Sequence, residues 1–503
     1  MEPYIIGIDL GTGSTKAVAL NYSGEVIASA QFHYSGLDAP HGYSEQDPEI
    51  IWKAFRNCLI DVTNILKQVP FAVSFSSCMH SLIVIDKNNH PITNLITWAD
   101  TRSEKIAEEI RQSDVAESIY RQSGTPIHSM SPLCKIIWFS RSQPGIFAKA
   151  FKFISIKEFI WHRLFGEYEI DQSIASATGL FNIEENIWNK QSLQLCNIDA
   201  EQLSAIVPTN FMRNKIRSNI AEELKISQDT QFCIGASDGC LANIGSFSLE
   251  PGTAALTIGT SGAVRIAHSS PVFNFGAMIF NYVLEGGTFI CGAPVNNGGN
   301  VLEWMMKNFL ENINPVDKDY VQFFNKVANT EAGCQGLIFL PYLHGERAPV
   351  WDEKASAVFF GIKSFHTQAH FSRAAIEGVC YALNNILEII EESAGPIRQL
   401  NVSGGFIHSG TWIQILADVT GKKICSIQAE DASSYGAAML YMKAMNLIED
   451  YQSLIPANEI IIEPVEENFS AHKKYYPVFK KLYGNLKDSM HTVNEIETLQ
   501  AEK

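Results

Sequence analysis

The sequence predicts an α/β protein built from two domains of duplicated architecture. Strand-like and helix-like stretches alternate along the chain, a pattern typical of α/β folds. Two glycine-rich runs with similar local settings begin the two halves; Gly11 and Gly259 lie 248 residues apart (259 minus 11) in a chain of 503. A repeated element at this spacing indicates duplication, and 503 residues are too many for one compact core.

The elements of the first half follow in order. A strand meander is expected over residues 4–10, 16–20 and 25–32, with a turn at residues 21–24. Asp47-Pro48-Glu49 is expected to begin a helix, because an N-cap residue, a first-turn proline and an early acid occur together. Residues 72–75 are expected to form a buried strand. Residues 76–80 would then lie at its carboxyl end, where open α/β sheets bind ligands.

The second half contains a clear strand, turn and helix. Residues 371–393 first carry an apolar helical stripe that is expected to face the core. Residues 400–403 are expected to form a short strand that ends in a turn at Gly404 and Gly405, and the following helix should stop at Gly421. Such a unit offers a ligand a bare backbone and a helix N-terminus.

Composition and charge narrow the class of protein. Hydrophobic residues make up 46% and charged residues 18% of the chain, which can therefore bury two cores. We expect domains over residues 1–245 and 246–503.

The net charge of −16, without clustered Lys and Arg, excludes a nucleic-acid or anionic-membrane surface. Expected partners are small molecules or other proteins, with a homodimer left open.

The sequence also predicts a cytoplasmic protein. Residues 1–3 lead directly into a strand, without a signal-peptide pattern, and no apolar run reaches the roughly 18 residues of a membrane span. The ten cysteines occur singly, without the spacing of metal ligands. They are expected to be reduced core residues.

The two glycine-rich runs are candidates for phosphate-binding loops. They are Asp9-Leu10-Gly11-Thr12-Gly13-Ser14-Thr15-Lys16 and Ile258-Gly259-Thr260-Ser261-Gly262, and each interrupts an apolar strand-like segment. Glycine lets backbone N–H groups converge on an anion, while Thr and Ser hydroxyls add donors. Either run alone is equally compatible with an ordinary hairpin. Because GxxxxGK[ST] and strand-linked GxGxxG are absent, P-loop and dinucleotide-binding folds are disfavoured.

Four motifs occur in the order found in one known family. They are DLGTGSTKA at residues 9–17, GASDG at 235–239, GTSG at 259–262 and VSGGF at 402–406. Residues 130–138 and 357–377 look like the two longer signatures of the same family. The chain therefore resembles the FGGY carbohydrate kinases over nearly its whole length. This resemblance implies two duplicated actin/hexokinase-like (ribonuclease H-like) α/β domains with a nucleotide cleft between them, and ATP and Mg²⁺ as cofactors.

Local segments favour one acceptor within that family. Residues 74–81, 97–103, 125–130 and 294–299 are most similar to gluconate kinases. Xylulose kinases look similar at Met79-His80 but usually place Gly after the His and Asn-Asp after the Trp, whereas Ser81 and Ala99 stand here. The resemblance thus implies phosphorylation of D-gluconate to 6-phosphogluconate, with D-xylulose as the alternative acceptor. A non-catalytic actin-like nucleotide-binding module is the alternative outside the enzyme class.

Two aspartates are candidates for the reaction centre. Phosphoryl transfer needs in-line positioning, charge neutralisation and an acceptor for the hydroxyl proton. Asp238 matches the family's catalytic base, which also contacts the acceptor; from the residues alone, a turn aspartate before glycine is the commoner interpretation. Asp9 would repel phosphate unless Mg²⁺ lay between them, so we assign it to Mg²⁺ through water; a strand-terminal turn residue is the alternative.

The resemblance implies nucleotide contacts in both halves. Lys16 would be a nearby cation or merely a solvated strand residue, and Ser409 would lie near the adenine or merely cap a helix. The glycines of the VSGGF motif would lie against the adenosine. The expected nucleotide-binding residues are Gly11, Thr12, Gly13, Ser14, Lys16, Gly259, Thr260, Ser261, Gly404, Gly405 and Ser409.

The acceptor is expected to meet two short segments of the first half. Met79 and His80 match the family's acceptor-contact position, where the His offers hydrogen bonds and the Met an apolar face. Trp98 can stack on the carbon chain and Asp100 can accept hydrogen bonds from hydroxyls. Arg102 could pair with a carboxylate.

Other side chains compete with Arg102 for that carboxylate. They are Lys135 and the amides of Asn296-Asn297. An arginine on a loop is more often a surface or ion-pair residue, so the sequence leaves this choice open.

Overall fold

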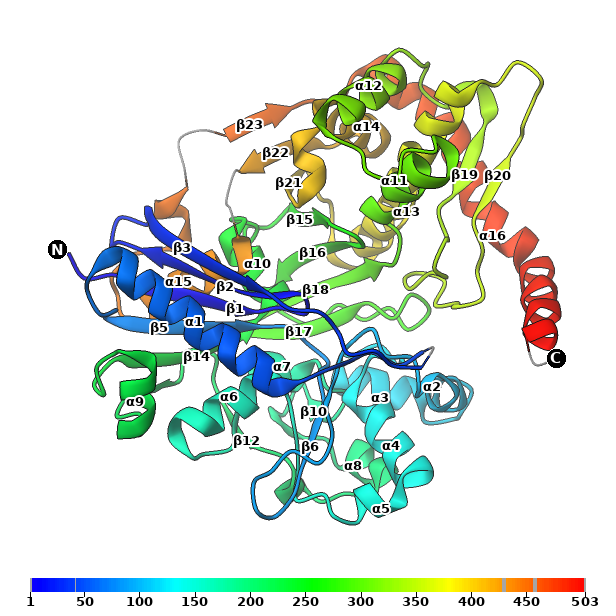
Figure 1. Cartoon of the computed structure of the whole chain (residues 1–503). Coiled ribbons are helices and arrows are strands. Elements are labelled where there is room, and N and C mark those ends of the chain that lie inside the picture. Colours follow the sequence, from blue (N-terminus) through cyan, green and yellow to red (C-terminus); the bar gives the residue numbers. More distant parts are fainter. Residues whose placement is uncertain (1, 41, 428–430, 456–458, 502–503) are drawn as a thin grey trace. The chain divides into compact units, whose positions relative to one another are not determined.

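The computed structural model describes residues 2–40, 42–427, 431–455 and 459–501 (Figure 1). The chain forms two compact units. Unit 1 comprises Met1–Leu249, Ala267–Cys291 and Ala429–Ile455, and unit 2 comprises Glu250–Ile266, Gly292–Gln428 and Pro456–Lys503. The chain leaves unit 1 close to the expected boundary but returns to it twice. The units are interleaved in sequence, and the division into residues 1–245 and 246–503 stays a prediction.

Unit 1 contains most of the short elements. Its strands are β1 (Ile5–Leu10), β2 (Ser14–Leu20), β3 (Val26–His33), β4 (Glu45–Gln46), β5 (Ala72–Ser77), β6 (Ile83–Ile85), β7 (Leu95–Ile96), β8 (Lys152–Ile154), β9 (Glu169–Asp171), β10 (Phe181–Asn182), β11 (Ile187–Trp188), β12 (Ala205–Val207), β13 (Met212–Arg213), β14 (Gln231–Ser237) and β17 (Phe280–Glu285). Its helices are α1 (Pro48–Leu66), α2 (Glu104–Arg111), α3 (Ala116–Ser123), α4 (Pro132–Ser142), α5 (Pro144–Phe147), α6 (Ile156–Phe165), α7 (Gln172–Ser176), α8 (Lys190–Cys196), α9 (Ser218–Leu224), α10 (Asp238–Gly245) and α15 (Ala432–Ala444), with 3₁₀ turns η1 (Ala200–Gln202) and η5 (Tyr451–Leu454).

A six-stranded sheet in the order β13-β14-β5-β1-β2-β3 forms the centre of unit 1. Strand β1 pairs antiparallel with β2 and parallel with β5, and β14 pairs parallel with β5. Strands β2 and β3 complete the predicted meander. The carboxyl ends of β1, β5 and β14 therefore lie along one edge of the sheet.

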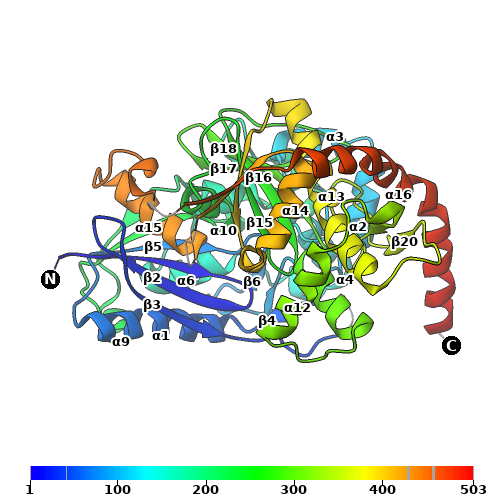
Figure 2. The ribbon, with the colours of Figure 1, turned by 90° about the horizontal axis from the view of Figure 1, so that it is seen from above.

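Helices cover both faces of this sheet. Ile6 and Ile8 belong to a buried cluster that also contains Phe55 of α1. Gly7 lies between them and must point to the other face, where an added Cβ would lie 1.8 Å from the carbonyl oxygen of Ser434 in α15. Figure 2 shows α1 and α15 on opposite sides of these strands. Close packing of α15 therefore explains the glycine in a buried strand.

The start of α1 confirms the predicted helix signal. Asp47 is the N-cap and accepts a hydrogen bond of 2.8 Å from the backbone N–H of Glu49, and Pro48 is the first helical residue. This arrangement satisfies one of the free N–H groups of the first turn.

Unit 2 contains the two longest described helices, α13 and α16. Its strands are β15 (Thr253–Ile258), β16 (Gly262–His268), β18 (Thr288–Val295), β19 (Ile338–Leu340), β20 (Val358–Phe360), β21 (Gln399–Ser403), β22 (Lys423–Ile427) and β23 (Glu459–Ile462). The last two residues of β16 and the first four of β18 are assigned to unit 1. Its helices are α11 (Gly299–Trp304), α12 (Asp317–Ala328), α13 (Gln368–Ala394), α14 (Gly410–Thr420) and α16 (Glu466–Ala501), with a π-helical turn η2 (Met305–Phe309) and 3₁₀ turns η3 (Cys334–Gly336) and η4 (Gly405–His408).

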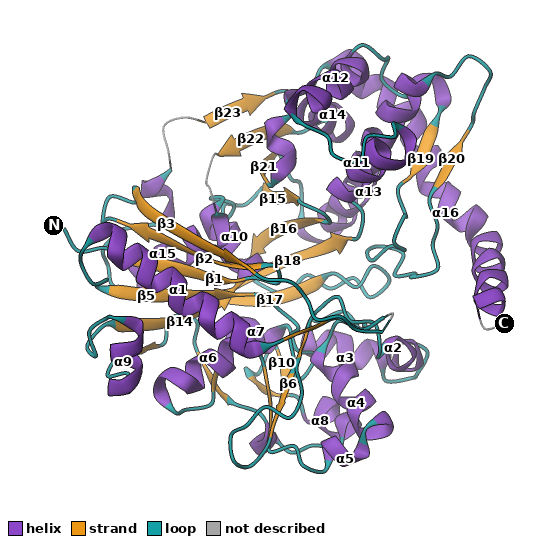
Figure 3. Ribbon diagram, viewed as in Figure 1, coloured by secondary structure: helices purple, strands orange, loops and turns teal. Residues whose placement is uncertain are grey.

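The core strands of unit 2 repeat the arrangement found in unit 1. Strand β15 pairs antiparallel with β16 across a glycine-rich loop and parallel with β21, as β1 does with β2 and β5. Strand β22 continues the parallel run. Helix α14 packs against α13, β22 and β23 (Figure 3). This shared arrangement confirms the predicted duplication and the mixed α/β class.

Two compositional expectations can be checked on the described residues. All ten cysteines are free and buried, as predicted. Within the described ranges, each helix is too short or too polar to traverse a lipid bilayer.

Candidate active site

The first glycine-rich loop joins β1 to β2 in unit 1. The N–H of Gly11 donates to the carbonyl oxygen of Ser14 over 3.0 Å, and the hydroxyl of Tyr34 donates to the carbonyl oxygen of Gly11 over 2.5 Å. An added Cβ at Gly11 would lie 3.0 Å from the carbonyl oxygen of Ser14, whereas Gly13 is exposed and has open space around it. The loop thus combines a tightly held first residue with an accessible tip.

Thr12 connects this loop to the predicted acceptor segment. The indole Nε1 of Trp98 donates to the Thr12 hydroxyl over 3.0 Å, and the side-chain amide of Gln46 donates to the Thr12 carbonyl. Thr12, a candidate for nucleotide binding, is therefore hydrogen-bonded to Trp98, a candidate for acceptor binding. Sequence reasoning missed Tyr34 and Gln46, because only the folded sheet brings them to the loop.

Three carboxylates lie near one another beside the first loop. Asp9 is the penultimate residue of β1 and accepts a hydrogen bond of 2.5 Å from the Ser76 hydroxyl of β5. Burial, and then the nearby carboxylates of Asp431 and Asp238, raise the pKa of Asp9 well above its ordinary value. Lys16 forms an ion pair of 3.1 Å with Asp431 and opposes this effect. A cation beside these carboxylates would relieve their repulsion.

This donor set fits Mg²⁺ bound mainly by water and phosphate. In the described parts of the chain, no three His, Cys, Asp or Glu side chains are grouped to hold a metal by themselves. Mg²⁺ typically keeps several waters and takes one or two protein carboxylates together with substrate phosphates. Asp9 can supply such a carboxylate.

Asp238 is the first residue of α10 and follows β14. Its side chain is half-buried, and Oδ1 accepts a hydrogen bond of 2.7 Å from the N–H of Gly239. Ser237 is the N-cap of α10. The carboxylate of Asp238 therefore lies at the N-terminus of α10, directly after the carboxyl end of β14.

Buried polar side chains fix the backbone just before Asp238. Lys157 donates to the carbonyl oxygen of Ala236 over 2.9 Å and forms a buried ion pair of 2.7 Å with Asp171. The Ser173 hydroxyl accepts the N–H of Ser237 over 3.1 Å. Sequence reasoning missed these residues, since no local pattern marks their proximity to Asp238.

The first acceptor segment follows β5. His80 is buried with φ 64°, a left-handed conformation that is uncommon for a non-glycine residue. Its Nε2 lies 3.3 Å from the hydroxyl of Tyr282 in β17. Met79 packs against a small apolar cluster that includes Ile174 and Val283. The position of His80 next to the carboxyl end of β5 agrees with the expected ligand-binding edge.

The second acceptor segment is held by an ion-pair network. Asp100 is fully buried; its Oδ1 accepts from the backbone N–H and Nε of Arg102, and its Oδ2 accepts from Nη2 of Arg102 and the N–H of Ser44. Nη2 also donates to Glu45 over 2.5 Å. Desolvation opposes the charge on Arg102, but these two carboxylates raise its pKa above the ordinary value.

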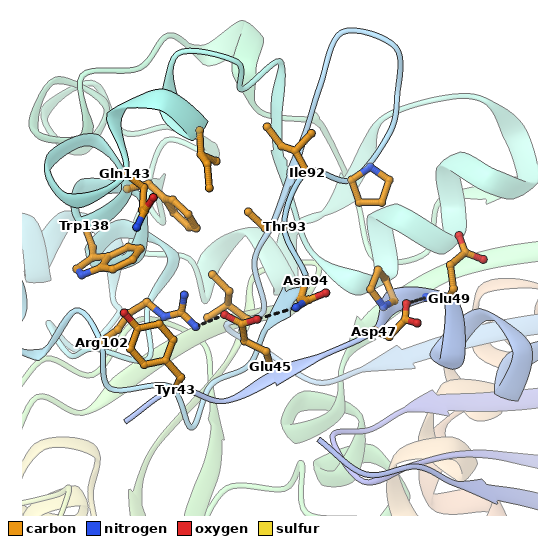
Figure 4. A pocket seen from close by; sticks show the side chains of 15 residues that line it. Tyr43, Glu45, Asp47, Glu49, Ile92, Thr93, Asn94, Arg102, Trp138 and Gln143 are labelled. Carbon is orange, nitrogen blue, oxygen red and sulfur yellow. Dashed lines mark hydrogen bonds and ion pairs between the residues drawn. The ribbon is translucent and has the colours of Figure 1, made fainter. Parts of the chain in front are cut away.

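Arg102 also lines a cavity of about 520 Å³ in unit 1. Its guanidinium carbon lies 3.9 Å from the ring centre of Tyr43 and 5.2 Å from that of Trp138 (Figure 4). Met79, His80, Trp98 and Asp100 are not among the residues that line this cavity. Arg102 therefore faces a cavity that the other acceptor candidates do not line.

The second glycine-rich loop joins β15 to β16 in unit 2. Gly259 and Thr260 are exposed, and Ser261 is partly exposed. Their carbonyl groups accept hydrogen bonds from the chain that enters α11: Gly298 N–H donates to Thr260 over 3.1 Å and Gly299 N–H donates to Gly259 over 2.7 Å. The loop thus has an accessible tip and a fixed base.

The VSGGF motif lies beside that loop in unit 2. Gly404 has φ 104°, and an added Cβ would lie 2.2 Å from the carbonyl oxygen of Ile258; only glycine fits there. Gly405 is exposed and begins η4, a turn that the sequence did not reveal. Ser409 is the N-cap of α14 and accepts from the N–H of Trp412 over 3.2 Å, and Gly421 ends the helix as expected.

The amides proposed as alternative carboxylate ligands are already engaged. Asn296 donates to the carbonyl oxygen of His344 and accepts from Nε of Arg347 over 2.7 Å. Asn297 donates to the carbonyl oxygen of Gly345 and to the carboxylate of Glu346. Both amides therefore stabilise the neighbouring segment of unit 2.

Comparison with known proteins places these features in a family. The N-terminal domain profile of the FGGY family of carbohydrate kinases matches residues 4–245, and its C-terminal domain profile matches residues 254–445. The gluconokinase of Bacillus subtilis is 37% identical over 492 residues, covering 96% of each chain. The xylulose kinase of Staphylococcus xylosus is 28% identical and covers 95% of this chain and 99% of its own.

Solved structures show the same fold. Structures of a gluconate kinase and of a xylulose kinase from Lactobacillus acidophilus each match with a TM-score of 0.93 and 31% identity, covering 98% of this chain and 100% of their own. These matches confirm the predicted two-domain fold. Because both have the same values, structural similarity does not separate the two acceptors.

Proposed function

Because the chain belongs to the FGGY family of carbohydrate kinases, we propose that its acceptor is D-gluconate and its product 6-phosphogluconate. Family membership makes the protein an ATP-dependent carbohydrate kinase, a phosphotransferase that acts on an alcohol group. The non-catalytic nucleotide-binding module is therefore not retained as an alternative.

This choice of acceptor rests on one observation: the chain has a higher sequence identity to a gluconokinase than to a xylulose kinase. The chain shares 37% of its residues with a gluconokinase and 28% with a xylulose kinase over almost the whole length. Ser81 and Ala99, which depart from the pattern of xylulose kinases, support the same choice. Xylulose kinase remains the second candidate, because a structure of that name matches as well as that of a gluconate kinase.

Asp238 is the proposed base. Its carboxylate would accept a hydrogen bond from the reacting hydroxyl of the acceptor and take its proton as the phosphoryl group transfers. Because such transition states are largely dissociative, orientation of the hydroxyl oxygen is as important as proton removal. The fixed backbone before Asp238 supports this role, since Lys157 and Ser173 hold the two preceding residues.

Thr12, Gly13 and Ser14 are the proposed donors to the β- and γ-phosphates, with Lys16 as a nearby cation. Mg²⁺, when bound, would neutralise charge on those phosphates. Asp9 is the proposed protein carboxylate for the ion, through water. In unit 2, the loop of Gly259, Thr260 and Ser261 and the Gly404-Gly405 turn are proposed to bind nucleotide, as the family resemblance implies.

The acceptor is proposed to lie against Met79, His80 and Trp98. His80 offers a ring nitrogen to hydroxyl groups, and Trp98, a partly exposed residue, is proposed to stack on the carbon chain. We keep Arg102 as a candidate partner for the acceptor carboxylate. Its pairing with Asp100 and Glu45 favours instead a role in holding Asp100.

The test is ATP-dependent phosphorylation of gluconate, xylulose, glycerol and rhamnulose by the purified protein, compared with Asp238→Asn. We expect gluconate to be the preferred acceptor. Asp238→Asn should lower kcat by at least about 10²-fold, the scale of general-base catalysis, while binding of ATP and gluconate changes little. Turnover by Asp238→Asn at the wild-type rate would refute the role of Asp238 as the base.

A further inference from the structure

A buried lysine joins the two segments that carry the acceptor candidates. Lys135 lies in α4 and its side chain is fully buried. Its Nζ donates to the carbonyl oxygen of His80 over 2.6 Å and to that of Thr97 over 2.7 Å. His80 lies in the first acceptor segment, and Thr97 immediately precedes Trp98 in the second. One side-chain amine therefore holds both segments by their backbones.

The lysine acts where the backbone pairing of the two segments ends. Leu82 and Ile96 exchange two hydrogen bonds of 3.0 and 2.8 Å. Closer to His80 and Thr97, the described residues form no further backbone hydrogen bond between the segments. Two carbonyl oxygens that converge without a donor repel each other, and the lysine amine, which has at least two N–H donors in either protonation state, removes that repulsion.

The carbonyl that Lys135 holds belongs to a residue with unusual backbone geometry. His80 has φ 64°, and such a conformation persists only when its surroundings fix it. On the other segment, Trp98 reaches the hydroxyl of Thr12. A change in the distance between the segments would therefore change the spacing of His80 and Trp98.

The surroundings of Lys135 argue against a role in general stability alone. Burial lowers its pKa to about 7, and Asp100 only partly offsets this effect. Among the described residues, no carboxylate lies within ion-pair distance of its Nζ. Burying a charge without such a partner is costly, and the contacts that offset this cost are the hydrogen bonds to the carbonyl oxygens of His80 and Thr97.

We propose that Lys135 is a positioning residue that sets the spacing of the two acceptor-binding segments by bonding the carbonyls of His80 and Thr97. This inference rests on the proposed function and deepens it. Lys135 thus affects acceptor affinity through His80 and Trp98, without contact to the acceptor itself.

The test compares Lys135→Met with a matched control, Lys152→Met. Nζ of Lys152 also donates to two backbone carbonyls in unit 1, those of Glu201 and Leu203, at 2.6 and 2.8 Å. Those carbonyls belong to a segment without acceptor candidates. The two variants therefore remove the same kind of contact from different places.

We expect Lys135→Met to raise the KM for gluconate at least tenfold and to leave the KM for ATP within threefold of wild type. Its melting temperature should rise with a non-hydrolysable ATP analogue as in wild type, but much less with gluconate. Lys152→Met should keep both KM values within twofold. A gluconate KM within twofold of wild type in folded Lys135→Met would overturn the proposal, and so would equal increases in both KM values.

Two further outcomes have a defined meaning. If Lys135→Met does not fold, Lys135→Gln retains a donor and is measured in its place; failure of both variants to fold would overturn the proposal in favour of a purely structural role. If the wild type phosphorylates xylulose rather than gluconate, the proposed acceptor fails. The same comparison on the KM for xylulose then still tests the lysine.

Discussion

Gly235→Ala is expected to displace the catalytic aspartate without touching it. Gly235 lies in β14, three residues before Asp238, with φ 67°. The pairing of β14 with β5 shifts register between Cys233 and Ala236. A Cβ at residue 235 would lie 1.7 Å from the carbonyl oxygen of Phe75 in β5.

The size of the effect follows from this contact. Non-bonded heavy atoms pack at about 3.5–4.0 Å, so the two strands would have to separate by roughly 1 Å or more. The left-handed conformation adds about 1–2 kcal/mol of strain for alanine. Because a misplacement of about 1 Å can reduce an enzymatic rate roughly 10²-fold, we expect kcat to fall by about that factor and the melting temperature to fall as well.

Gly166→Ala is the matched control in unit 1. Gly166 ends α6 with φ 84°, and its added Cβ would meet the flexible end of Arg217 at 2.6 Å rather than a backbone atom. It shares the left-handed strain of Gly235→Ala but not the strand displacement. The assay is steady-state kinetics together with thermal unfolding. If Gly235→Ala folds and its kcat equals that of Gly166→Ala, the close approach of β14 to β5 at Gly235 does not position Asp238.

Two further predictions concern the charged groups around the acceptor segments. Arg102→Ala leaves Asp100 buried without its partner, so the free energy of unfolding should fall by about 3–5 kcal/mol. The KM values for gluconate and xylulose should rise by similar factors. An increase in KM for gluconate alone would instead assign Arg102 as the partner of the acceptor carboxylate. Lys135 has a pKa of about 7 against an ordinary 10.5, so between these values the unfolded chain binds more protons and folding stability rises with pH. The free energy of unfolding of wild type minus that of Lys135→Met, measured by denaturant unfolding, should increase by about 1.4 kcal/mol per pH unit between pH 7.5 and 9.5. Arg102 stays charged in that range because its pKa is raised, and the neighbouring thiols of Cys78 and Cys134 stay neutral because burial raises their pKa to about 12 and about 11. A flat difference would contradict this prediction.

Local signals were sufficient for the elements that carry the two glycine-rich loops. The hairpin of β1 and β2 is indicated by two apolar segments on either side of a glycine-rich turn, and the N-cap at Asp47 and the stop at Gly421 are set by residues within one helical turn. The family motifs allowed the fold to be predicted, because their order along the chain is specific even where each motif is short.

Contacts between distant segments could not be predicted from the sequence. Lys16 pairs with Asp431, and Trp98 bonds to Thr12, because the folded unit brings segments together that no local pattern connects. The return of residues 267–291 and 429–455 to unit 1 is a property of tertiary packing. The same holds for Lys135, whose contacts with two carbonyls distinguish it from an exposed ligand-binding lysine only in the folded structure.

The most direct test of the central claim is the ratio of kcat/KM for gluconate to that for xylulose, with the phosphorylated products identified by mass spectrometry and ³¹P NMR. Asp238→Asn serves as the inactive control. We predict ATP-dependent formation of 6-phosphogluconate, with a ratio of at least about 10², equivalent to roughly 2.7 kcal/mol of transition-state discrimination. A ratio below one, or no phosphorylated gluconate at all, would contradict it.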